Sequence, residues 1–245
     1  MSATTIEALY RVSSIERRTP TIVELRLRPV TGTLPFLPGE YVLLEDREAA
    51  VPPRSYSIAN APRPDGLISL LITRVPGGRT STWIHDRLSI DDELSIDGPY
   101  GTFVDDPACS APCLFLAAGS GLAPMRALLE AALLAGTRRS VTLMFSARTE
   151  ADVIDAELFV GWQQRHPRFH FIRTLTRAAG PPPTGRLPAL LLSLGQDLGE
   201  HDVFIAGAPR FVAECAVAAE TLGAAPHRVH TEPFFVESEP SPGEE

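Results

Sequence analysis

The chain has 245 residues, 44% of them hydrophobic and 21% charged, so it can form one large or two small globular domains and is not disordered as a whole. Its 30 acidic residues outnumber 22 basic ones, and every basic residue is Arg because the sequence contains no Lys. This composition excludes Schiff-base, Walker-type and Ser–Lys chemistry and disfavours binding to duplex nucleic acid.

The first half of the chain has the two-residue periodicity of half-buried β-strands. Apolar and polar side chains alternate strictly from Val23 to Arg28, and a short helix is expected over 81–88 with Ser81 as its N-cap. Similar strand-like segments, separated by Gly- and Pro-containing turns, are 41–44, 55–58, 67–73 and 93–96. This pattern predicts a closed antiparallel β-barrel as the first domain, over residues 1–108.

The second half alternates fully apolar strands with helices. The expected strands are 113–118, 141–145, 169–175 and 203–206, and the expected helices are 123–134, 152–165, 187–194 and 209–222. Such alternation predicts a parallel sheet covered by helices, which we place over residues 109–236. The acidic segment 237–245, rich in Pro, Ser and Glu, is expected to be disordered.

A glycine-rich turn follows the first of these apolar strands. Gly119 and Gly121 permit a tight turn around Ser120, and Pro124 suits the first turn of the helix that begins there. Free N–H groups at such a helix start bind phosphate. A plain strand–turn–helix junction is the alternative, because Pro124 replaces the third Gly of the usual dinucleotide motif.

Arginine stands where a dinucleotide site selective for NAD would have a carboxylate. Arg148 ends the next strand, and Arg177 and Arg186 lie near the end of the following one. Three guanidinium groups converging there would bind a ribose 2′-phosphate and favour NADPH, with about 1.5–3 kcal/mol from each charge-assisted hydrogen bond. Taken singly, each Arg is more typical of a solvated surface position, and it is the arrangement of all three that favours the phosphate site.

A second anion-binding pattern lies in the barrel half. Arg54-Ser55-Tyr56-Ser57 ends a strand, and the Gly-containing segment 77–82 leads into the short helix. Phosphate sites in both domains predict two phosphorylated cofactors that face each other. Packing within the barrel is the alternative role for Tyr56.

In this order the motifs resemble those of flavin-dependent reductases of the ferredoxin–NADP reductase type. Residues 54–57 are similar to the R-x-Y-S flavin motif of that family, 98–101 to its G-P-x-G turn and 119–124 to its G-T/S-G-x-x-P motif. Residues 206–209 stand where the family usually has C-G-x-P, and 232–234 resemble its terminal E-x-F. The three Arg residues and the segment 235–237 are similar to features of the bacterial branch. The sequence has no cysteine pattern for an iron–sulfur cluster, so we expect a stand-alone reductase without an iron–sulfur domain.

The resemblance implies an FAD-binding barrel followed by an NADP-binding domain. Arg54 then pairs with the flavin phosphates, Tyr56 stacks on the isoalloxazine, and Ser57 hydrogen-bonds near N5. Hydride passes from nicotinamide C4 to flavin N5, so the expected catalytic residues are Tyr56, Ser57, Ser120 and Glu232. The expected cofactor-binding residues are Arg54, Ser55, Tyr56, Ser57, Thr80, Ser81, Thr82, Gly119, Ser120, Gly121, Pro124, Arg148, Arg177, Arg186, Gly207, Pro209 and Phe235.

The implied function is an NADPH-dependent reductase that passes electrons through FAD to a separate acceptor. That acceptor is a ferredoxin, a flavodoxin, an oxygenase component or a small molecule, and the reductase is expected to be a monomer. Ala206 replaces the family Cys, which motivates an alternative function as a flavin-bearing electron-transfer or sensor subunit. Either Phe234 or Phe235 is expected to shield the flavin face, and a surface carboxylate is the alternative for Glu232.

Other functional classes are less consistent with the sequence. Ser120 resembles a hydrolase nucleophile, but Ala118 and Leu122 stand where that motif requires Gly. Pro167 interrupts the helix that would align His166 and His170 as metal ligands, so no metal site is expected. With no secretion signal and no apolar run of the ~20 residues that span a bilayer, we expect a soluble, cytoplasmic protein without membrane association.

Overall fold

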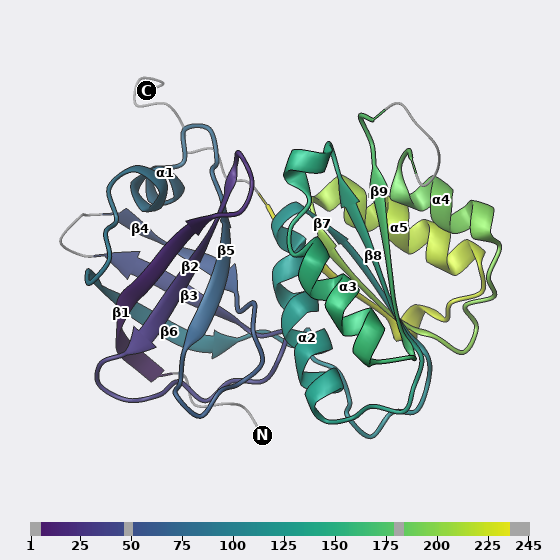
Figure 1. Cartoon of the computed structure of the whole chain (residues 1–245), viewed down its shortest axis with the longest axis horizontal. Coiled ribbons are helices and arrows are strands. Elements are labelled where there is room, and N and C mark those ends of the chain that lie inside the picture. Colours follow the sequence, from purple (N-terminus) through teal and green to yellow (C-terminus); the bar gives the residue numbers. More distant parts are fainter. Residues whose placement is uncertain (1–5, 47–50, 179–183, 236–245) are drawn as a thin grey trace.

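The computed structural model describes residues 6–46, 51–178 and 184–235. One antiparallel and one parallel sheet lie side by side, with helix α2 between them (Figure 1). The predicted fold class, a β-barrel followed by an α/β domain, is confirmed. The first sheet ends at Tyr100 and the second begins at Cys113, on either side of the boundary predicted at 108/109.

Six antiparallel strands form the barrel, in the order β4-β3-β6-β1-β2-β5. They are β1 (Ile6–Arg17), β2 (Ile22–Pro29), β3 (Tyr41–Asp46), β4 (Val51–Ser57), β5 (Ile68–Thr73) and β6 (Glu93–Tyr100). A bridge between Ile58 and Leu70 joins the two edges of the sheet and closes the barrel. Leu25, Leu27 and Leu70 are fully buried inside it, as the alternating pattern requires.

The short helix of the barrel domain starts earlier than predicted. Helix α1 spans Arg79–Asp86 and its N-cap is Gly78, so the assignment of Ser81 as N-cap is wrong. Ser81 instead lies within the first turn, where its hydroxyl accepts a hydrogen bond from the backbone N–H of Val75 at 3.1 Å. The side chain therefore ties the preceding loop to the helix start.

The parallel sheet has the strand order β11-β10-β7-β8-β9. Its strands are β7 (Cys113–Ala118), β8 (Val141–Ala147), β9 (Phe169–Leu175), β10 (Asp202–Gly207) and β11 (Val229–Pro233). Its helices are α2 (Leu122–Leu134), α3 (Ala156–Arg165), α4 (Leu187–Leu194) and α5 (Pro209–Thr221). Helix α3 starts later than predicted because Thr149 and Asp152 form a capping box around a short 3₁₀ turn, and Asp155 then adopts φ +56°.

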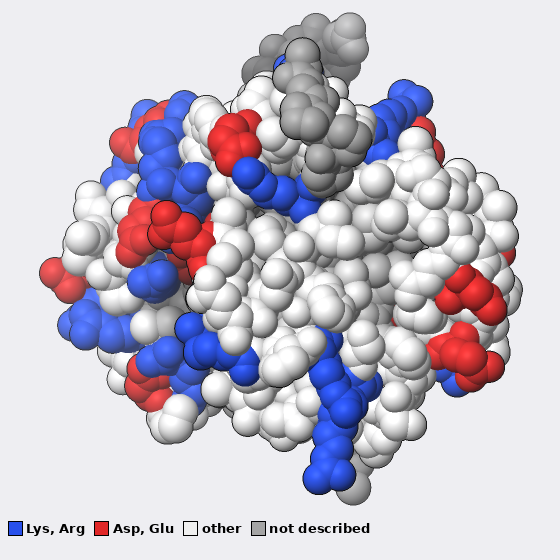
Figure 2. Space-filling view, turned by 45° about the vertical axis from the view of Figure 1, so that its right-hand side comes forward, with Lys and Arg blue, Asp and Glu red and all other residues white. Residues whose placement is uncertain are grey.

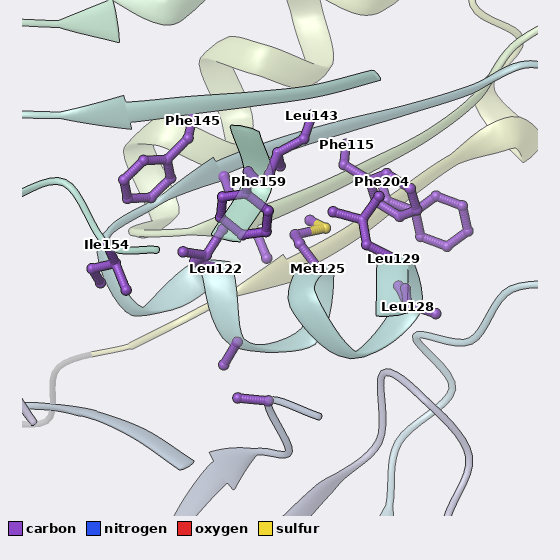
Figure 3. Packing of buried hydrophobic residues seen from close by; sticks show 14 of the residues in the cluster. Phe115, Leu122, Met125, Leu128, Leu129, Leu143, Phe145, Ile154, Phe159 and Phe204 are labelled. Carbon is purple, nitrogen blue, oxygen red and sulfur yellow. The ribbon is translucent and has the colours of Figure 1, made fainter. Parts of the chain in front are cut away.

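Alternate residues of the sheet belong to two separate cores. Phe115 and Phe145 pack with α2 and α3, whereas Leu116 and Ile205 pack with α4 and α5. Figure 3 shows the first of these cores, with the apolar face of α2 directed at the sheet. The same cluster extends into the barrel domain, to which Ile22, Ala59, Leu71 and Phe103 belong.

The described ranges contain neither a membrane-spanning helix nor a cluster of metal ligands, and their surface charge is mixed. No helix there is long and apolar enough to cross a membrane, and no group of three or more His, Cys, Asp or Glu side chains is placed to hold a metal ion. On the face shown in Figure 2, Arg side chains at the left and along the upper edge lie beside carboxylates, a further Arg group at the lower centre has none beside it, and uncharged surface separates these groups. That face therefore presents no continuous basic surface of the kind that binds duplex nucleic acid.

Candidate functional site at the domain interface

A cleft of about 1000 Å³ lies between the two domains. Its walls are β4, the segment from β5 to α1, the glycine-rich turn and the carboxyl ends of β8, β10 and β11. Ligands of open parallel sheets bind at such strand ends. Predicted site residues that line it are Arg54, Ser55, Tyr56, Ser57, Thr80, Ser81, Gly119, Ser120, Arg148, Gly207, Glu232 and Phe235.

Strand β4 supplies the barrel wall of the cleft. Tyr56 is half-buried and packs partly against the barrel core, so it is both a packing residue and part of the cleft wall. Burial raises the pKa of the Tyr56 phenol, against the opposing effect of the Arg54 charge. The phenol therefore stays protonated at neutral pH and presents an uncharged ring and hydroxyl.

Ser57 and Glu232 connect the two domains at the centre of the site. The Ser57 hydroxyl donates to Oε1 of Glu232 at 3.3 Å, while Oε2 is buried and has no hydrogen-bond partner within the described part of the chain. Burial raises the pKa of Glu232 to about 7, although the Ser57 hydrogen bond opposes the shift. This carboxyl group can therefore exchange a proton near neutral pH.

The glycine-rich turn is held between both domains. Gly119 has φ +57°, and no described atom lies within 4 Å of the position that a Cβ would take there, so the backbone is open to a ligand. Thr73 of β5 donates to the Ser120 hydroxyl at 2.9 Å. Gly121 packs so closely on β10 that a Cβ would lie 2.3 Å from the Ala206 carbonyl oxygen.

The start of α1 forms the second anion-binding geometry. Thr80 and Ser81 have buried side chains, and the Thr80 hydroxyl donates to the Pro52 carbonyl at 2.7 Å. This bond fixes the helix start against β4, whose Arg54 lines the same wall. Thr82, also predicted, lies in α1 but does not line the cleft.

The three predicted Arg residues are only partly brought together. Arg148 lines the cleft, and its carbonyl accepts the backbone N–H of Arg177 at 2.8 Å, so these two exposed residues are neighbours. Arg186 instead pairs with Glu214 of α5. Arg177, Arg186, Gly121, Pro124 and Pro209 do not line the cleft.

Several cleft residues were not predicted from the sequence. Thr73 and Ser146 lie at or near the carboxyl ends of β5 and β8, Thr176 follows β9, and Tyr41 begins β3. Their positions at strand ends were the available signal, but they belong to no motif. The observed groups are hydroxyls and Arg side chains around open glycine backbone, with one carboxyl oxygen that has no partner among the described residues, and they are of the kind that can hold phosphorylated cofactors.

Family models of known proteins match both halves of the chain. An oxidoreductase FAD-binding domain model matches residues 10–104, and an oxidoreductase NAD-binding domain model matches residues 115–216. Ferredoxin–NADP reductase B of Sorangium cellulosum is 33% identical over 236 residues, which cover 91% of this chain and 96% of that protein. The chain belongs to the ferredoxin–NADP reductase-type flavin reductases.

Other members of this reductase family are components of larger systems. The chain is 32% identical to terephthalate 1,2-dioxygenase reductase component 1 of Comamonas sp. and 30% identical to the propane 2-monooxygenase reductase component of Rhodococcus jostii. The alignments cover 88% and 82% of this chain but 64% and 56% of those proteins. The chain thus spans about three fifths of the length of these two relatives.

Solved reductases share the fold. The cytochrome P450 reductase GcoB of Amycolatopsis superposes with a TM-score of 0.88 at 26% identity, over 96% of this chain and 71% of that one. A ferredoxin NADP⁺ reductase from Neisseria gonorrhoeae, solved with FAD and NADP, gives a TM-score of 0.81 at 21% identity, over 96% and 100% of the two chains. The latter likeness concerns the fold alone.

Proposed function

We propose that this protein is an NADPH-dependent reductase that holds FAD on the barrel and NADPH on the α/β domain and passes electrons to a separate acceptor. The observation that carries the proposal is the cleft in which Ser57, from the flavin motif, contacts Glu232, from the last described strand of the second domain. The relatives named as reductase components of oxygenases support a protein acceptor such as a ferredoxin, a flavodoxin or an oxygenase component.

The protein's own contribution is binding, orientation and proton handling. Arg54, Thr80 and Ser81 would hold the FAD phosphates, and Tyr56 would form a wall against the flavin ring. FAD held by these residues would supply the chemistry that converts two-electron hydride transfer from a nicotinamide into one-electron transfer to an acceptor. Glu232 would hold a proton at Oε2 in the buried centre of the cleft, since its pKa of about 7 allows both charge states.

Turnover by the flavin-loaded protein tests the proposal directly. We expect the purified protein to oxidise NADPH in the presence of a dye acceptor. Absence of turnover with both NADPH and NADH would show that the proposed reductase activity is wrong. Bound flavin that nicotinamide reduces only when a partner protein is present would instead support the sensor or electron-transfer subunit.

The sensor alternative depends on Ala206, which stands at the position of the family Cys. The Ala206 side chain is fully buried in the core with α2 and does not line the cleft. The presence of Ala instead of Cys at position 206 therefore gives no structural reason for a loss of reductase activity. We favour the reductase function over the sensor function.

Arg148 is the residue expected to select NADPH over NADH. An Arg148→Ala variant should raise the KM for NADPH roughly 10-fold or more, because a charge-assisted hydrogen bond to the 2′-phosphate is lost, and should change the KM for NADH less than about twofold. Steady-state kinetics with both coenzymes measure this. Arg186→Ala is the control and should have a smaller effect, because Arg186 already pairs with Glu214. Equal effects of Arg148→Ala on both coenzymes would contradict the assignment.

A further inference from the structure

Arg126 of α2 joins the two domains through one buried guanidinium group. It is 6% exposed, and its Nε donates to the Ala59 carbonyl at 2.5 Å. Nη1 donates to Oδ2 of Asp155 at 2.7 Å, and Nη2 donates to Oε1 of Glu24 at 2.6 Å and to the Ser69 hydroxyl at 3.0 Å. A single side chain of the second domain thus contacts three separate segments of the barrel.

The charges around Arg126 are balanced. Glu24 and Asp155 supply two carboxylates, Arg18 pairs with both of them, and Arg26 pairs with Glu24. Glu16, which pairs with Arg18 and Arg26, supplies the third carboxylate against the three Arg residues. Burial alone would raise the pKa of Glu24, but the Arg126 charge, with hydrogen bonds from Ser69 and Arg126, lowers it to about 2. The Glu24 carboxylate therefore stays ionised. Removing Arg126 would leave the buried carboxylates of Glu24 and Asp155 without this partner.

A second contact from the same helix reaches the same barrel segment. Glu130, one turn after Arg126, accepts the backbone N–H of Ala61 at 2.8 Å through Oε2. Asn60, between Ala59 and Ala61, is held to the barrel because its Oδ1 accepts the Ser69 N–H at 2.6 Å. Helix α2 therefore binds the segment 59–61, which is itself hydrogen-bonded to strand β5 of the barrel.

Each end of this connection leads to one half of the cleft. The segment 59–61 that α2 contacts begins two residues after Ser57, the last residue of the flavin-motif strand β4. Helix α2 directly follows the glycine-rich turn, and Figure 3 shows it packed between the parallel sheet and the barrel strands. A helix that is hydrogen-bonded to the continuation of β4 at both Ala59 and Ala61 has little freedom to change its orientation relative to that strand.

We propose that Arg126 is a positioning residue for hydride transfer, whose fork of N–H donors fixes the nucleotide-binding turn relative to the flavin-binding strand. Arg126 does not line the cleft, so it acts without touching either cofactor. The proposal rests on the proposed reductase function for its kinetic consequence but not for its geometric one. Because Lys cannot reproduce the planar, multidentate fork, charge alone should not restore the function.

Pre-steady-state kinetics separate positioning from simple loss of stability. In Arg126→Met and Arg126→Lys, we expect the rate of flavin reduction by NADPH to fall roughly 30- to 100-fold, since misplacement by about 1 Å has effects of this size. The Kd values for FAD and NADPH should change less than about threefold, because the cofactor-contacting residues remain. Arg139→Met is the matched control: Arg139 is 7% exposed and pairs with Asp105, away from the cleft, so its rate should stay within about twofold.

An interdomain distance provides a measurement that does not depend on activity. Spin labels at Ile90→Cys in the barrel domain and Leu194→Cys at the end of α4, both exposed positions, report it by pulsed electron resonance in a Cys109→Ser background. We expect a shifted or broadened distance distribution for Arg126→Met and Arg126→Lys and an unchanged one for Arg139→Met. If Arg126→Met does not fold, Arg126→Lys carries both measurements.

Two outcomes would overturn the proposal. One is an unchanged distance distribution in both Arg126 variants. The other is a rate that falls no more than in Arg139→Met at equal loss of thermal stability. If the unsubstituted protein is reduced by neither NADPH nor NADH, the proposed function fails, while the distance measurement still decides whether Arg126 orients the domains.

Discussion

Replacing Gly121 by Ala is expected to lower the free energy of unfolding by about 3 kcal/mol, the upper part of the range for overpacking a well-packed core. The new Cβ would lie 2.3 Å from the Ala206 carbonyl oxygen and 2.7 Å from the Gly207 nitrogen. Both are backbone atoms of β10, so no side-chain rotation can relieve the overlap. The φ of Gly121 is −59°, an ordinary helical value, and the whole cost is therefore steric.

Gly119→Ala is the matched control, two residues earlier in the same turn. There φ is +57° and no described atom lies within 4 Å of the added Cβ, so the cost is the left-handed backbone alone, about 1–2 kcal/mol. Urea unfolding of the two variants measures both values. If the two variants lose equal stability, the close packing of the turn on β10 does not explain the Gly at 121.

Glu232→Gln is expected to make the protein more stable than the unsubstituted chain above pH 7. The pKa of Glu232 is about 7 in the folded protein and near its ordinary 4.5 in the unfolded chain. Between these values the folded state binds the extra proton, so stability falls as pH rises through this window, by about 3 kcal/mol at most. Gln cannot ionise, so the variant should lose this part of the pH dependence.

Thermal or urea unfolding of the flavin-free protein from pH 4.5 to 9 tests this expectation. Ser57→Ala is the companion variant: removing a hydrogen bond that lowers the pKa of Glu232 should extend the decline to higher pH. If Glu232→Gln and the unsubstituted protein give parallel stability curves across this range, the carboxyl group does not titrate near neutral pH.

Elements bounded by strong local signals were predicted best. Strand β9 and helix α4 have the residue ranges expected from the sequence, and α4 is bounded by Pro188 in its first turn and by Gly195 at its C-cap with φ +60°. Strand β11 was missed because it is an edge strand of polar and half-buried residues, and its pattern is weak. Strand β1 was also missed, although Ala8, Tyr10 and Val12 alternate as buried residues.

The residues of the candidate site that belong to a sequence motif were predicted, whereas residues that contact each other only in the fold were not. Residues within contiguous motifs, such as Arg54, Tyr56 and Ser120, could be named from the sequence and lie in one cleft. Glu24 could not, because its alternating strand predicts a solvent-facing side chain, whereas the outer side of β2 is covered there by Arg126 of α2. Local sequence patterns hold no information on the pairing of Glu24 with Arg126, which lie 102 residues apart. From the sequence alone, Arg126 could not be distinguished from a surface Arg.

The apolar cluster shared by both domains has a consequence for engineering this reductase. Ile22, Ala59 and Leu71 of the barrel pack in the same core as Met125 and Leu128 of α2. A chimera made by exchanging the coenzyme domain at the linker would therefore cut through a hydrophobic core. A chimera should therefore keep the barrel-facing residues of α2 from the same protein as the barrel. The exchanged domain would then contribute its coenzyme preference, and the apolar contacts between the two domains would be preserved.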